Sequence, residues 1–201
     1  NYSLPNMKYP IKLNFKKIAL AKQAQLTDAA GEPIAYARQK MFKLKEELEV
    51  FRDKSREERL CLIKADRVID FSAAYQFLNE EGAVFGVIKR EGLKSIWKAT
   101  YNLNHDANTP FASIREEKPF AKLADALVGG IPVIGLFCNY LFNPSYLLTN
   151  SEGIDLFRIR KSPSLFGTVF DIEKLSDDHQ DKEVLSLMGI LMMVFLEQAR
   201  G

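Results

Sequence analysis

The chain has 201 residues, of which 47% are hydrophobic and 27% are charged, and this composition is typical of one globular domain with a real core. The net charge of +2 is too small to demand a nucleic-acid partner, and we expect none. Cys61 and Cys138 each lie in an apolar run, which suits a reducing compartment better than a disulfide framework. No basic segment followed by an apolar run marks a signal peptide at the start. We therefore expect a single domain over residues 1–201, located in the cytoplasm.

The first 22 residues combine a flexible start, predicted over residues 1–8, with a strand-like run, KLNF, that follows Pro10. They carry five lysines and no acidic residue: Lys8, Lys12, Lys16, Lys17 and Lys22. Two interpretations stay open for these lysines. They belong to a solvated edge strand, or they form a basic patch for anionic lipid or phosphate.

A hairpin-like unit recurs four times in the chain, at residues 23–38, 75–89, 100–115 and 146–160. The residue five positions before the turn is always apolar: Leu26, Phe77, Leu103 and Leu148. The turn itself contains a polar residue and then one that tolerates positive φ: Asp28 with Gly31, Asn79 with Gly82, His105 with Asn108, and Asn150 with Gly153. Seven positions after the turn, the residue is always basic: Arg38, Lys89, Arg115 and Arg160. This pattern predicts four β-hairpins.

The outgoing strands of these hairpins have two different faces, because successive side chains alternate across a strand. One face is small or uncharged, with Ala35, Ala37, Gly86 and Ala112, and the other ends in the cations. Further strand-like runs lie between the hairpins: KLKEELEVFRD, ERLCLIKA, RVIDFSAAYQFL, LKSIWKATYNL and LFGTVFDIEKL. The total is close to twelve strands.

An apolar excursion is predicted over residues 118–147, beginning with a helix over KPFAKLADALV. Residues 126–148 carry no formal charge, but glycine and proline interrupt the stretch near its start, and asparagine and proline near its end. Three arrangements stay open: a segment folded over one end of the domain, an exposed segment that meets a membrane or a partner, and, as the least favoured, a transmembrane helix. The side chains expected to make such a contact are Ile131, Val133, Phe137 and Tyr140.

The C-terminal segment 180–199 predicts a helix that is apolar on every face over LSLMGILMMVFL, residues 185–196. A helix of this kind is buried on all sides, and this apolar run is too short for a bilayer, which needs ~20 residues. The small faces of the hairpins leave room for it. The sequence thus predicts a mainly β fold, a closed antiparallel barrel of about twelve strands around a hydrophobic central helix.

This plan resembles that of the Tubby C-terminal-like superfamily, which includes scramblases and LURP-one-related proteins. The segment GVIKREGLKSIWKATYNL, residues 86–103, looks like the strand–turn–strand of scramblase-like and LURP-one-related members, and the ending LMGILMMVFLEQARG is similar to that of bacterial members. The resemblance covers nearly the whole chain from Tyr9 onward. It implies the same barrel, and it implies binding of phosphoinositides or other phospholipids at membranes.

Catalysis has little support in the sequence. The two histidines, His105 and His179, lie in a turn and in a polar linker. None of the HExxH, CxxC, P-loop or GxSxG patterns is present, and no aspartates are placed together as an acid and a base. We expect neither an enzyme nor a metal or cofactor site.

The best functional candidate is the stretch KREGLKSIWK, where cations surround an aromatic residue as in sites for phosphorylated head groups. The residues predicted to bind an anionic head group are Lys89, Arg90, Lys94 and Lys98, with Arg158, Arg160 and Lys161 from the fourth hairpin. Trp97 either anchors the site at a membrane surface or packs within the barrel. We therefore expect a non-enzymatic, scramblase-like module that binds anionic phospholipid and associates with the membrane periphery. The alternative is a protein-interaction or scaffold domain that uses the apolar residues 128–147.

Overall fold

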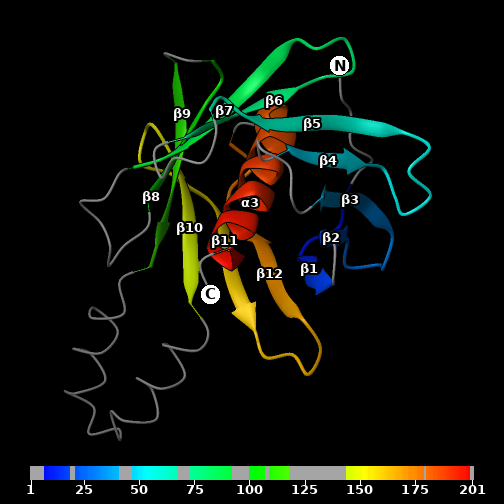
Figure 1. Cartoon of the computed structure of the whole chain (residues 1–201). Coiled ribbons are helices and arrows are strands. Elements are labelled where there is room, and N and C mark those ends of the chain that lie inside the picture. The colour runs from blue at the N-terminus through cyan, green and yellow to red at the C-terminus, as the bar shows by residue number, and fades with distance from the viewer. Residues whose placement is uncertain are drawn as a thin grey trace, which may run out of the picture.

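The computed structural model describes residues 7–18, 21–40, 47–67, 73–91, 100–106, 109–117, 144–178 and 180–199. Within these ranges, twelve antiparallel strands form a closed barrel (Figure 1). Each strand pairs with its neighbours in sequence, and β1 closes the barrel by pairing with β12. The strands are β1 Ile11–Ile18, β2 Ala21–Thr27, β3 Pro33–Lys40, β4 Glu47–Phe51, β5 Arg59–Ala65, β6 Ala74–Leu78, β7 Val84–Arg90, β8 Thr100–Asn104, β9 Pro110–Glu116, β10 Ser145–Asn150, β11 Asp155–Ser162 and β12 Thr168–Lys174. The predicted barrel of about twelve strands is confirmed.

The repeated unit forms the hairpins β2–β3, β6–β7, β8–β9 and β10–β11. Its turn glycines take positive φ as predicted, with values of 87° at Gly31, 82° at Gly82 and 86° at Gly153. In each of these hairpins the pairing shifts by a β-bulge directly after the conserved apolar position of the repeat. The four apolar residues at that position, Leu26, Phe77, Leu103 and Leu148, are fully buried.

The polar residue that begins each turn bonds to the turn's own backbone. Oδ1 of Asp28 accepts hydrogen bonds from the amides of Ala30 and Glu32, at 2.8 and 2.9 Å. Oδ1 of Asn79 accepts one from the amide of Ala83 at 2.7 Å. These bonds satisfy backbone donors that the hairpin ladder leaves free, which explains why an aspartate or asparagine recurs at this position.

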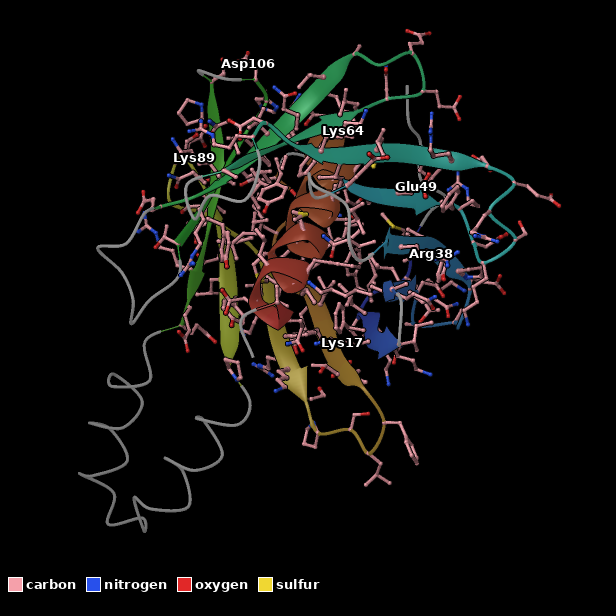
Figure 2. All side chains as sticks on the ribbon, viewed as in Figure 1. Lys17, Arg38, Glu49, Lys64, Lys89 and Asp106 are labelled. Carbon is pink, nitrogen blue, oxygen red and sulfur yellow. The ribbon has the colours of Figure 1, made fainter. Side chains whose placement is uncertain are left out.

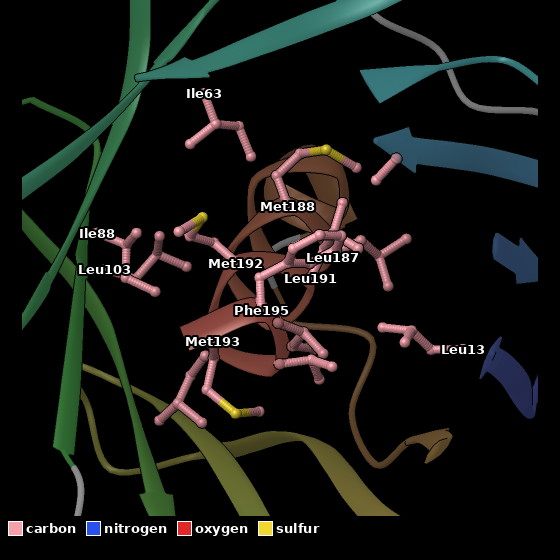
Figure 3. Close-up of a cluster of buried hydrophobic side chains, with 14 of the residues drawn as sticks. Leu13, Ile63, Ile88, Leu103, Leu187, Met188, Leu191, Met192, Met193 and Phe195 are labelled. Carbon is pink, nitrogen blue, oxygen red and sulfur yellow. The ribbon is translucent and has the colours of Figure 1, made fainter. Parts of the chain in front are cut away.

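A helix, α3 (Glu183–Gln198), packs inside the barrel (Figure 3). It follows a short 3₁₀ turn, η2 (Gln180–Lys182). Met188, Leu191 and Phe195 are each at most 1% exposed, so the prediction that all faces of this helix are buried is confirmed along its length from residue 185 to residue 195. The core residues of the strands, such as Leu13, Ile63 and Ile88, point toward it (Figure 3).

Small residues let the helix approach the strands closely. A Cβ atom added at Gly86 on β7 would lie 2.2 Å from Leu185 Cδ1, and one added at Gly189 on the helix would lie 2.8 Å from Leu103 Cδ2. Ala35 and Ala37 are fully buried, as expected for the inward face of β3. The barrel is therefore filled by protein side chains.

Charged residues lie around the outside of the barrel (Figure 2). Lys89 and Arg115 are exposed and Arg38 is half-buried, in agreement with the outward direction predicted for all three.

The predicted start of the last strand is wrong. The strand-like run LFGTVFDIEKL begins at Leu165, but β12 begins at Thr168, so Leu165 and Phe166 are not part of it. Gly167 has a φ of 77°, a conformation that ends extended backbone, so these two residues belong to the loop before the strand.

The predicted helix over KPFAKLADALV and most of the apolar excursion lie outside the described residues, as do residues 1–6 of the start predicted to be flexible. The last residues of the excursion, Ser145–Leu147, belong to β10. In the described part of the chain, no helix has both the length and the apolar character needed to cross a membrane.

Candidate functional site

A groove of about 460 Å³ runs over β7, β8, β9 and β10 on one side of the barrel. We call it the β7–β10 groove. It is lined by Lys89, Asn102, Asn104, Pro110, Ala112, Ser113, Arg115, Asn150 and Ser151. Seven of these nine residues carry polar or cationic side chains, and none is acidic, so the groove offers hydrogen-bond donors and positive charge to a ligand.

The cations of the groove are Lys89 and Arg115, which occupy the same position in two copies of the repeated hairpin. Lys89 pairs with Asn102 across β7 and β8, and Asn102 pairs with Ser113 across β8 and β9, so these three residues form one row on the outer face. Neither cation makes an ion pair with a described residue. Both charges are thus free to meet an anion.

One carboxylate lies close to the row. Asn102 donates a hydrogen bond from Nδ2 to Oε1 of Glu91, at 3.0 Å. This bond turns the carbonyl oxygen of Asn102 away from Glu91 and holds its amide in a fixed orientation. Glu91 is not among the residues that line the groove.

Asn150 lines the groove, and its side-chain nitrogen is a buried donor. Its Oδ1 accepts hydrogen bonds from the amides of Glu152 and Ile154, at 3.0 and 2.8 Å, and these two bonds fix the orientation of the side-chain amide. The side chain is only 5% exposed, and Nδ2 is buried without a hydrogen-bond partner among the described residues. A buried, unpaired donor costs roughly 1–3 kcal/mol, which a ligand acceptor would recover.

The corresponding residues of two other hairpins do not have this donor. In place of the amide nitrogen, Asp28 has a second carboxylate oxygen, which lies 3.4 Å from the amide nitrogen of Lys8. The pKa of Asp28 is lowered, because hydrogen bonds from the amides of Glu32, Ala30 and Lys8 outweigh the opposing effect of burial. Asn79 has the same side chain as Asn150, but it is half-buried and none of its atoms is a buried, unpaired donor. The free Nδ2 of Asn150 is thus a property of this hairpin and not of the repeat.

Of the predicted head-group ligands, Lys89 lines the groove and Arg90 does not. Arg90 pairs with Tyr101, whose side chain is fully buried, so it belongs to the opposite face of β7. Tyr101 bonds through its hydroxyl to Glu197 near the end of α3. Burial, together with the negative charge of Glu197, raises the pKa of Tyr101, and the nearby Arg90 guanidinium partly opposes that effect. Arg90 therefore lies at the helix C-terminus inside the barrel rim.

Arg158 and Arg160 on β11 are engaged in ion pairs. Arg158 lies 3.3 Å from Glu117 and 3.7 Å from Glu173, and Arg160 lies 3.3 Å from Glu173. Lys161 forms no ion pair with a described residue, but it lies on the inward-facing side of β11, opposite Phe170. The structure does not bring these three residues into the β7–β10 groove.

The other predicted contacts, Lys94, Trp97, Lys98, Ile131, Val133, Phe137 and Tyr140, lie outside the described residues. The ring of His105 packs against that of Phe111, with centroids 5.0 Å apart. His179 lies outside the described residues. Within the described ranges, no cluster of His, Cys, Asp or Glu side chains could hold a metal ion.

Two residues that line the groove, Arg115 and Asn150, were not among the ligands predicted from the sequence. Arg115 was visible as the basic position of the third repeat, and its equivalence to Lys89 was the signal that could have found it. Asn150 was visible only as a turn residue, because its role depends on burial. No protein-family model, no curated protein and no solved structure matches this chain.

Proposed function

We propose that this protein binds anionic phospholipid and that the β7–β10 groove receives the head group. The observation that carries the proposal is the lining of this groove. Lys89 and Arg115 form no ion pair with a described residue, Nδ2 of Asn150 has no partner among the described residues, and none of the nine lining residues is acidic. A phosphate or carboxylate oxygen is an acceptor for all three.

The lining of the site favours the binding of an anion. Seven of the nine described residues that line the groove are polar or cationic, and they offer hydrogen-bond donors from four neighbouring strands. The resemblance of the sequence to Tubby-like and scramblase-like proteins points to the same class of ligand. The alternative, a protein-interaction domain that uses residues 128–147, depends mainly on residues outside the described part of the chain.

The experiment is binding of the full chain to vesicles of phosphatidylcholine with and without phosphatidylserine, at rising salt. Each cation near an anionic surface contributes ~1 kcal/mol, so replacing Lys89 and Arg115 with alanine should weaken binding at low salt about 30-fold. The wild-type affinity should fall as salt rises, because screening weakens these contacts.

A matched control removes two other exposed cations from the outer face, Lys12 on β1 and Lys64 on β5, which form no ion pairs with described residues. The Lys12→Ala, Lys64→Ala variant changes the net charge equally and should bind nearly as well as wild type. Equal losses in both variants would mean that net charge, and not the groove, directs the binding. Wild-type protein that ignores anionic vesicles at low salt would refute the proposal.

A further inference from the structure

The loop between β11 and β12 exposes two large apolar side chains at its tip. Leu165 is 95% exposed and Phe166 is 82% exposed, the highest values among the large hydrophobic side chains of the described residues. The loop lies beyond the last strand pairs, Ser162 with Val169 and Phe15 with Thr168, so it projects from the sheet. We call residues 163–167 the β11–β12 tip.

The tip has a defined shape. Ser164 Oγ donates to the carbonyl oxygen of Phe166 at 3.1 Å and accepts from the Phe166 amide at 3.3 Å. At its base, Thr168 Oγ1 lies 3.1 Å from Oε1 of Gln198 at the end of α3. The tip is therefore tied to the central helix while Leu165 and Phe166 stay in water. Exposure of both side chains together is unfavourable in water and favourable at an apolar boundary.

One lysine of β1 lies against the base of the tip, and a second follows it along the strand. A Cβ atom at Gly167 would lie 3.3 Å from Cγ of Lys16, which places this lysine directly against the loop. Lys17, which is labelled in Figure 2, and Ile18 follow it at the end of β1, and both are exposed. Neither lysine forms an ion pair with a described residue.

Two carboxylates in this region are half-buried and engaged by hydroxyl groups. Asp171 accepts a hydrogen bond from Ser162, and Glu197 accepts one from Tyr101. Lys16 and Lys17 are exposed, so they are the charges that the end of β1 presents to the solvent beside the apolar projection. An anionic bilayer offers a complement to both features, with acyl chains for the side chains and head groups for the lysines.

We infer that the β11–β12 tip inserts Leu165 and Phe166 into an anionic bilayer while Lys16 and Lys17 contact its head groups. This inference rests on the proposed function, because it names the surface through which the same protein meets the membrane. It adds an apolar contact that the β7–β10 groove lacks. Lys89 and Arg115 lie near the ends of β7 and β9, at the barrel end where α3 terminates, and the tip projects from this same end (Figure 1).

The test compares wild type with Leu165→Ser, Phe166→Ser in two assays. The first is binding to phosphatidylcholine–phosphatidylserine vesicles, and the second is binding to soluble short-chain phosphatidylserine below its micelle concentration. Loss of two inserted side chains should weaken vesicle binding about 100-fold and leave binding of the soluble lipid unchanged. A fluorophore on Leu165→Cys should shift to the blue when vesicles are added, which a purely structural role of the loop would not produce.

The control variant is Val84→Ser, Leu175→Ser, which removes two exposed apolar residues from the opposite end of the barrel. It should bind vesicles as wild type does. Vesicle binding by the tip variant equal to wild type, or no blue shift, would overturn the inference even if the soluble lipid still binds. Wild type that binds neither vesicles nor the soluble lipid would overturn both proposals. Loss of vesicle binding in the tip variant alone, with no effect of Lys89→Ala and Arg115→Ala, would support the tip and refute the groove.

Discussion

Replacing Gly86 with alanine tests the contact between the barrel wall and its central helix. The added Cβ would lie 2.2 Å from Leu185 Cδ1 and 2.9 Å from Phe77 Cδ2, whereas ordinary contacts lie at 3.4–4 Å. The Leu185 side chain must therefore move by more than an ångström in a region that is fully packed. Overpacking of this kind costs ~1–3 kcal/mol.

A smaller effect acts in the opposite direction. Alanine has less conformational freedom than glycine in the unfolded chain, which favours the folded state by ~0.4–1 kcal/mol where the backbone accepts alanine. Gly86 is not among the glycines with positive φ, so this gain applies. The net destabilisation should be about 1–2 kcal/mol, corresponding to a fall in Tm of about 2–8 °C for a domain of this size.

The assay is urea unfolding followed by circular dichroism, with Leu185→Ala as the second arm of a double-mutant cycle. Leu185→Ala alone should destabilise by ~2–5 kcal/mol, but it removes the closer of the two clashes and leaves only the contact with Phe77. In that background Gly86→Ala should cost less than it does in wild type, which gives a coupling energy of about 1 kcal/mol. Additive effects, or a Gly86→Ala variant more stable than wild type, would show that Leu185 does not pack on Gly86.

Three further predictions concern single side chains. Asn150→Asp keeps the Oδ1 acceptor of the turn but replaces the free donor with a negatively charged oxygen. The affinity for soluble phosphatidylserine should fall about tenfold or more, and an unchanged affinity would exclude a contact to Asn150. The lowered pKa of Asp28 means that its stabilising effect is present above its unfolded pKa and is lost as pH falls through the folded value; Asp28→Asn should therefore flatten the acid side of the stability–pH curve. Burial raises the pKa of Cys61 to about 12, so in a Cys138→Ser background a thiol reagent at neutral pH should react only as fast as the protein unfolds, and rapid labelling of the native state would contradict the buried position.

The fold could be predicted because local and global signals agreed. The four repeats combine a turn glycine, a polar turn residue and an inward apolar residue, and each of these features follows from local hairpin chemistry. The small inward positions at Ala35, Ala37 and Gly86, together with a helix that is apolar all round, left one arrangement that buries both. The ends of the elements were less predictable: the run that begins at Leu165 has the composition of a strand, but Gly167 ends it.

The site could be predicted only in part. Lys89 was predicted from the KREGLKSIWK stretch and lines the groove, and strand alternation already separates it from its neighbour Arg90, although the two were grouped. The unpaired donor of Asn150 could not be predicted from the sequence, because it results from burial and from two backbone hydrogen bonds that fix the side-chain amide. The same holds for Arg158 and Arg160, whose charges are neutralised by Glu117 and Glu173, residues distant in sequence or on another strand.

The most direct test of a head group in the β7–β10 groove is the nuclear magnetic resonance signal of the Asn150 side-chain amide. The ¹⁵N-labelled protein would be titrated with soluble short-chain phosphatidylserine, and the signal would be assigned by its absence in Asn150→Asp. The Nδ2 protons should shift with the binding curve, because a new acceptor meets a donor that has no partner among the described residues. Shifts that occur elsewhere on the barrel while the Asn150 amide stays unchanged at saturation would contradict the account.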